Sequence, residues 1–172
     1  LTFDLDDNVC GAINQTIDIP IRVKNFSKVS SFQFSLKIND AARADIISIE
    51  KGNVSGDLNT GLISTSSATV TWDNPSAAID LADNSIVMIV KVRLKSSFTG
   101  SSAIVIINTP TAISAEQNNI EVIPTVIGGS YCIGATAFKL CGKITREDNV
   151  TIANVVVTLS GGKNSIATTN SN

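Results

Sequence analysis

From Ser31 to Ile38 the sequence alternates between polar and apolar side chains, within the segment VSSFQFSLKIND at residues 29–40. Because successive side chains of an extended chain point to opposite faces, this pattern predicts a half-buried strand of an antiparallel sheet. Its apolar face carries Phe32, Phe34, Leu36 and Ile38, and its polar face carries Ser31, Gln33, Ser35 and Lys37. Two aromatic residues on one face place the centre of the core here. The other face is polar, with small side chains, and is free to meet a partner.

Short strand patterns recur along the chain, separated by turns, and no helix of useful length interrupts them. Pro20 cannot donate a ladder hydrogen bond, so we expect it at a sheet edge or a bulge. Residues 52–61 are predicted to form a polar, mobile loop. The predicted strands are residues 1–5, 16–23, 29–40, 46–50, 62–65, 67–73, 85–94, 103–108, 120–127 and 130–133. The fold class is therefore all-β: an about nine-stranded jelly-roll β-sandwich that ends near residue 134.

A second β unit is expected after this sandwich. Residues 135–140 are predicted to be a linker, and residues 141–172 contain strand patterns at 150–160 and 165–169 around a Gly-Gly turn. Two or three strands cannot bury a core by themselves. We therefore expect this second unit to be incomplete: either truncated, or completed by another chain.

Charge and hydropathy exclude several partners. Only 16% of residues are charged and the net charge is −2, so no basic surface is expected to hold nucleic acid or anionic lipid. Lys91, Arg93 and Lys95 alternate along one strand, which indicates a solvated strand face rather than a phosphate site. Apolar runs are too short to span a bilayer. The composition is typical of a secreted or cell-surface β protein, and the absence of an initiator Met and a signal peptide suggests a processed piece of a longer chain.

Candidate catalytic and metal-binding chemistry is sparse. The sequence has no His, which excludes Ser-His-Asp and Cys-His sites and the commonest zinc ligand. No carboxylate pair has a glycosidase pattern, so we expect no enzyme activity and no cofactor. Asp4, Asp6 and Asp7 could offer oxygen ligands to Ca²⁺, although an acidic, solvated turn explains them better.

Two further features leave alternatives open. Trp72 is the only Trp in the sequence. Packing in the core explains it better than stacking on a sugar. The sugar-stacking alternative would make the sandwich a carbohydrate-binding module. The three cysteines, Cys10, Cys132 and Cys141, allow one disulfide, which an extracellular location would favour.

The order of these motifs resembles a cohesin module, the extracellular β-sandwich that recognises dockerin. The resemblance covers residues 1 to about 134, and residues 141–162 resemble the start of a carboxypeptidase-regulatory-like or prealbumin-like sandwich. The segments that carry the cohesin resemblance are the opening strand, IDIPIRVKNF (17–26), VSSFQFSLKIND (29–40), TVTWDNPS (69–76), IVMIVKVRLK (86–95) and IPTVIGGSYCI (123–133).

The resemblance implies a binding face and a disulfide. Dockerins lie across the sheet that contains the third cohesin strand, and the matching polar face here comprises Ser31, Gln33, Ser35, Thr69 and Thr71. The closing strand of a cohesin-like sandwich runs beside the first, which implies a bridge between Cys10 and Cys132, with Cys141 as the alternative partner of either.

These inferences together indicate a function. We expect a non-enzymatic, extracellular protein-protein interaction or adhesion module of a large bacterial surface or secreted protein, whose partner is a dockerin-like module or a neighbouring subunit. The alternative is a structural subunit of an extracellular filament or surface layer, a homopolymer built by β-strand addition between chains.

Overall fold

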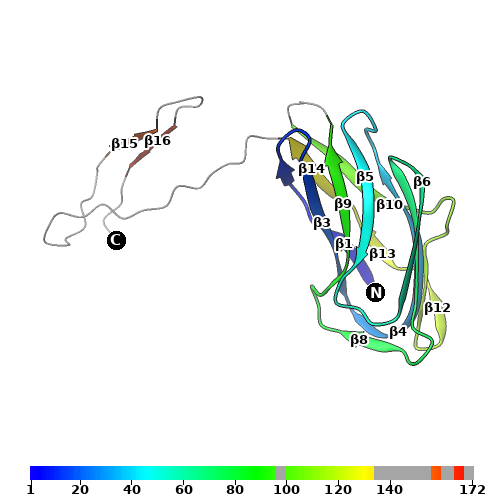
Figure 1. Ribbon diagram of the computed structural model, residues 1–172. Coiled ribbons are helices and arrows are strands. Elements are labelled where there is room, and N and C mark those ends of the chain that lie inside the picture. The colour runs from blue at the N-terminus through cyan, green and yellow to red at the C-terminus, as the bar shows by residue number, and fades with distance from the viewer. Residues whose placement is uncertain (96–99, 134–155, 160–164, 169–172) are drawn as a thin grey trace, which may run out of the picture. The chain divides into compact units, whose positions relative to one another are not determined.

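The computed structural model describes residues 1–95, 100–133, 156–159 and 165–168. The chain divides into two units, Leu1–Thr136 and Ala137–Asn172. In the first unit two sheets are stacked face to face as a sandwich (Figure 1). The described residues include no helical segment with the length and apolarity of a transmembrane span.

The first sheet has five strands in the order β13-β1-β3-β9-β5. Its centre is the pair β3 and β9. β3 alternates buried apolar residues with more exposed residues, whereas β9 begins with the apolar run Ile86–Val90 and alternates only from Val90 to Leu94. The bounds are β1 Thr2–Leu5, β3 Thr16–Lys24, β5 Ala44–Lys51, β9 Ile86–Leu94 and β13 Thr125–Ile127.

The second sheet has nine strands arranged around β4, the thirteen-residue strand that contains the alternating Phe-rich segment. β4 is long enough to pair with four neighbours: β11 and β10 in succession along one side, and β8 and β7 along the other. The remaining strands extend from β11, β10 and β7. The bounds are β2 Val9–Gly11, β4 Phe26–Ile38, β6 Asp57–Ser64, β7 Ser67–Asp73, β8 Ile79–Leu81, β10 Ser101–Ile107, β11 Ser114–Gln117, β12 Ile120–Val122 and β14 Gly129–Ile133.

The core lies between the sheets and contains an aromatic cluster centred on Phe32. The ring of Phe32 lies 4.9 Å from that of Phe3, 6.3 Å from Phe26, 6.0 Å from Phe34 and 5.0 Å from Trp72, measured between centroids. The predicted apolar face of β4 is confirmed, because Phe32, Phe34, Leu36 and Ile38 are all buried.

Trp72 belongs to this core. Its side chain is 1% exposed, and its indole Nε1 donates a hydrogen bond to the carbonyl oxygen of Ser55 at 2.8 Å. The core interpretation is therefore confirmed, and a sugar-stacking role for Trp72 is wrong because its ring faces no solvent.

Pro20 is not on an edge strand, since β3 lies between β1 and β9. β1 ends at Leu5, opposite Ile21, so Pro20 lies just beyond the last paired residue of that neighbour. The Pro20 carbonyl accepts a hydrogen bond from the Asp6 amide at 3.1 Å, and the β3–β9 register shifts at the next step, between Ile21 and Arg22. Pro20 itself pairs with Ile89, so it lies neither on an edge strand nor in the bulge, which begins one residue later.

Several segments differ from the predicted strands, and β2 and β8 form where no strand was predicted. Residues 57–61, expected in a mobile loop, are the first part of β6, because polar residues at a sheet edge pair as well as apolar ones do. Residues 114–117 form β11 inside a segment predicted to be only turns. Residues 120–127 are two strands in different sheets, since the chain crosses the sandwich at Ile123 and Pro124.

Both chain ends of the sandwich pair in parallel. β1 pairs with β13 in the first sheet, and β2 pairs with β14 in the second. Cys10 and Cys132 are direct partners in the β2–β14 pair, with their Cα atoms 4.5 Å apart, and they form a disulfide. The structure thus contains the bridge that the resemblance implies; the alternative cysteine, Cys141, lies outside the described residues.

In the second unit the described residues are two antiparallel strands, β15 (Val156–Leu159) and β16 (Ser165–Thr168). They lie within the two strands predicted there, at residues 150–160 and 165–169. The expected linker at residues 135–140 lies outside the described residues. The expectation that this unit is incomplete stays a prediction.

Candidate protein-binding face

The predicted binding residues lie on the outward side of five adjacent strands, β6, β7, β4, β11 and β12, which we call the polar face. Because directly paired residues in a ladder point to the same side of the sheet, the registers define rows of side chains across this face. One row is Asn59, Thr71, Gln33 and Ser114, and the next row is Asp57, Asp73, Ser31, Glu116 and Glu121.

A shallow hollow of about 340 Å³ lies at the centre of the polar face. Ser31, Gln33, Thr71, Asp73 and Ser114 line it, and Phe32, Trp72 and Ala115 complete its lining. The structure therefore brings together three of the five predicted binding residues, Ser31, Gln33 and Thr71, all half-buried. The lining offers hydroxyl, amide and carboxylate groups, which together can donate and accept hydrogen bonds.

The other two predicted residues have structural partners. Ser35 is fully buried: its Oγ accepts a hydrogen bond from the Thr111 amide at 3.0 Å and lies 3.4 Å from the Thr111 carbonyl oxygen. Ser35 thus anchors the segment after β10, and its assignment as a surface contact is wrong because that segment covers it. Thr69 is half-buried and its hydroxyl donates to the Gly61 carbonyl at 3.3 Å.

The second row of the polar face is acidic, which the sequence analysis missed. Its four carboxylates, Asp57, Asp73, Glu116 and Glu121, form no ion pair with any residue that the structure describes. Asp57 is opposite Asp73, and Glu116 is opposite Glu121, so like charges face each other at both ends of the row. Glu121 accepts a hydrogen bond from the Ser114 hydroxyl at 2.8 Å. Asp73 could have been found from the alternation after Thr71, but Glu116 lay in a segment predicted to be turns.

On the first sheet, by contrast, the cations that alternate from Lys91 to Lys95 are paired with carboxylates. Lys91 Nζ lies 3.0 Å from Asp18 and 3.4 Å from Glu50, and the hydrogen bond and charge of Asp18 raise the pKa of Lys91. Lys95 Nζ lies 2.8 Å and Arg93 Nη2 lies 3.9 Å from the Asp45 carboxylate. The alternating cations are therefore matched by acids on neighbouring strands, and this arrangement leaves no cluster of free cations to hold a phosphate.

Asp45 is the buried acid of this sheet. Burial by itself would raise the pKa of Asp45, but the Lys95 ammonium, the Thr65 side chain and the charge of Arg93 outweigh it, so the pKa lies below its ordinary value. Asp45 is thus an ionised partner of two cations and stabilises the edge of the sheet.

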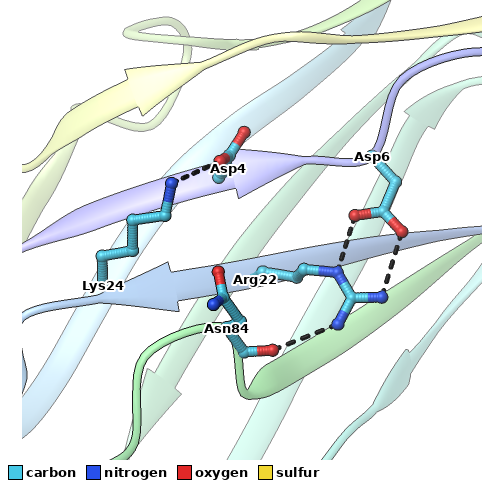
Figure 2. Close-up of polar contacts among 5 residues, drawn as sticks. All are labelled: Asp4, Asp6, Arg22, Lys24 and Asn84. Carbon is cyan, nitrogen blue, oxygen red and sulfur yellow. Dashed lines mark hydrogen bonds and ion pairs between the residues drawn. The ribbon is translucent and has the colours of Figure 1, made fainter.

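Two of the carboxylates considered for Ca²⁺, Asp4 and Asp6, are held by cations (Figure 2). Asp6 receives two hydrogen bonds from the Arg22 guanidinium, at 2.8 and 3.2 Å, and Lys24 Nζ lies 3.3 Å from Asp4. The hydrogen bond and charge of Asp6 raise the pKa of Arg22. Asp7 accepts from the Ser130 hydroxyl at 3.0 Å. Calcium at Asp4 and Asp6 would have to displace both cations; within the described residues no group of three or more acidic or cysteine side chains could hold a metal ion.

Comparison with solved structures gives the fold. The sixth cohesin of scaffoldin B from Acetivibrio cellulolyticus, solved in complex with a mutant Cel5 dockerin, superposes with a TM-score of 0.65 at 16% identity, covering 78% of this chain and 100% of that one. The first unit has the cohesin fold. The OlpA cohesin of Clostridium thermocellum, in complex with Doc918, gives a TM-score of 0.63 at 17% identity, with 78% and 100% covered.

The cohesin fold extends beyond cellulosomes among these structures. A non-cellulosomal cohesin from the archaeon Archaeoglobus fulgidus superposes with a TM-score of 0.63 at 14% identity, covering 79% of this chain and 92% of that one. No protein-family model matches the sequence, and no curated protein matches it significantly. The similarity therefore lies in the strand arrangement and not in shared sequence.

Proposed function

We propose that the first unit is a non-enzymatic, extracellular protein-binding module that binds a dockerin-like partner through the polar face. The observation that carries the proposal is the central hollow, in which Gln33, Thr71 and Ser114 offer hydrogen-bonding groups on an open sheet face. On β4 and β7 the other side of the same sheet packs in the core. The disulfide between Cys10 and Cys132 supports an oxidising, extracellular location.

The polar face has the size and chemistry of a protein interface. Five strands at a spacing of ~4.8 Å make a face about 20 Å wide, broad enough for another small module to lie across it. The acidic row favours a partner that presents Lys or Arg side chains beside hydrogen-bonding groups, because complementary charge increases the association rate and the specificity.

Isothermal titration calorimetry of the whole chain against dockerin modules tests this proposal, with the Cel5 and Doc918 dockerins as first probes. Thr71→Arg places a large cation in the hollow and should weaken binding by at least about tenfold, since truncated or blocked central contacts typically cost more than ~1.4 kcal/mol. Thr125→Arg is the matched control, because Thr125 is exposed on β13 in the other sheet.

The outcomes distinguish the parts of the proposal. Binding that Thr71→Arg weakens and Thr125→Arg leaves unchanged supports the polar face as the binding site. Equal affinity of both variants would reject the polar face, and no heat with any dockerin would reject a dockerin-like partner. A decrease in affinity between about 50 and 500 mM salt is expected from the acidic row, because salt screens exposed charges.

A further inference from the structure

The longest unprotected sheet edge in the described part of the chain is β6. β6 has eight residues and pairs only with β7, so alternate backbone groups along it point away from the sheet. Four other edge strands of the sandwich, β2, β8, β12 and β13, have three residues each, and β15 and β16 have four residues each. The remaining edge, β5, also has eight residues, but it carries Asp45, Glu50 and Lys51 and has a bulge between Ile46 and Ser48.

β6 lacks the features that normally block strand addition. Its sequence, DLNTGLIS, contains no Lys, Arg or Pro, and its single charge is Asp57 at the first position. Leu62 and Ile63 are 54% and 51% exposed. The one irregularity, a register shift between Leu62 and Ser64, is at the far end and leaves residues 57–62 in regular pairing with β7. Natural proteins protect long edges with charges, proline or bulges, because unpaired backbone groups recruit other strands.

We propose that β6 pairs antiparallel with β6 of a second copy of this chain and joins the two second sheets into one continuous sheet. Antiparallel pairing about a two-fold axis is self-complementary, since each strand presents the other with its own sequence in reverse. A register centred on Thr60 places Thr60 opposite Thr60 of the partner subunit and Leu58 opposite Leu62 of the partner subunit. Apolar residues on one side of the new ladder then meet each other, and Asn59 faces Gly61 of the partner subunit.

Repulsion between the two Asp57 side chains disfavours registers that are shifted toward the start of the strand. In the Thr60-centred register the two Asp57 residues are six residue steps apart, or about 20 Å at ~3.4 Å per residue. A register centred on Leu58 would bring them within two steps, where like charges destabilise the pairing. The polar face stays open in this dimer, because the new contact lies at its edge. The inference is therefore independent of the proposed partner of that face.

Cysteine crosslinking of the whole chain tests the register. In a Cys141→Ser background, Thr60→Cys places two thiols directly opposite each other across the two-fold axis, within the Cα separation that a disulfide needs. We expect it to form a covalent dimer at least about tenfold faster than Thr125→Cys, an exposed control on β13, because pairing raises the local thiol concentration to the millimolar range. Equal rates for the two variants would overturn the proposal.

Sedimentation velocity supplies a second, independent measurement. The unmodified chain should show a rising dimer fraction between roughly 10 and 500 µM, the range expected for a small interface. Leu62→Lys, which adds an edge charge and keeps the backbone donor, should return it to monomer, whereas Ile120→Lys, at an exposed site on β12, should not. A monomer at every concentration, or a dimer that Leu62→Lys leaves intact, contradicts the proposal.

Discussion

Replacing Phe32 by Leu tests whether the aromatic cluster or simple apolar volume holds the sandwich together. Among the described residues Phe32 has four ring partners, Phe3, Phe26, Phe34 and Trp72, at centroid distances of 4.9 to 6.3 Å. Phe26 has two, Phe32 and Trp72, at 6.3 and 6.2 Å. Both side chains are 2% exposed, so Leu substitutions at the two sites remove similar apolar area and differ mainly in ring contacts.

The expected magnitudes follow from those contacts. Each aromatic pair contributes ~0.5–1.5 kcal/mol beyond area burial, and values within one cluster are not additive. We expect Phe32→Leu to reduce the free energy of unfolding by about 3 kcal/mol and Phe26→Leu by about half as much. Phe32→Ala, which also leaves a cavity, should cost about 4–5 kcal/mol.

Urea unfolding followed by Trp72 fluorescence measures these differences, with the disulfide intact and the m-value compared between variants. An unchanged m-value means that the midpoint shift reports stability and not a change in the unfolded state. If Phe26→Leu costs as much as Phe32→Leu, ring contacts do not determine the stability of this core, and the reasoning from centroid distances is refuted.

Three further predictions use the same assay. Replacing both bridged cysteines by serine should cost about 4–5 kcal/mol, because the bridge closes a loop of 122 residues; a smaller loss than for Phe26→Leu would contradict this. Gly56→Ala should reduce the free energy of unfolding by about 2–3 kcal/mol, since the new Cβ would lie 2.5 Å from a backbone oxygen. Gly100 has a similar positive φ but open space around it, so Gly100→Ala should cost only about 1 kcal/mol. Asp45→Asn should cost about 1–3 kcal/mol at pH 7. Because the folded-state pKa of Asp45 is lowered, this difference should be full above about pH 5 and should shrink as the pH falls toward the folded-state value. A constant difference down to about pH 2 would contradict this.

The fold was largely predictable because alternation is a local signal. β3 shows it over nine residues and β4 over the eight residues from Ser31 to Ile38, and in both the alternating apolar side chains are buried. β6 and β11 were not predictable in this way, since a strand at or near the edge of a sheet buries few side chains and so need not alternate. The division at Pro124 also escaped prediction, because residues on both sides of it are β-branched and only the pairing shows that they belong to different sheets.

The candidate site was predictable only in part for a related reason. Ser31, Gln33 and Thr71 share the hollow because they alternate with core residues of adjacent strands. Ser35 follows the same alternation, yet a segment far along the chain covers it, and no local pattern reports that contact. The acidic row depends on the registers of four strand pairs, which connect residues between 57 and 121.

The bond between Cys10 and Cys132 converts most of the sandwich into a covalent ring. A protease that cuts the chain once between these residues opens the ring but separates no fragment. A nicked molecule therefore migrates as a single polypeptide mass on a non-reducing gel and as two pieces after reduction. A surface loop of this unit can thus be cleaved without loss of either piece. Every strand from β3 to β13 then remains covalently connected to the rest of the chain, because the disulfide joins the two pieces.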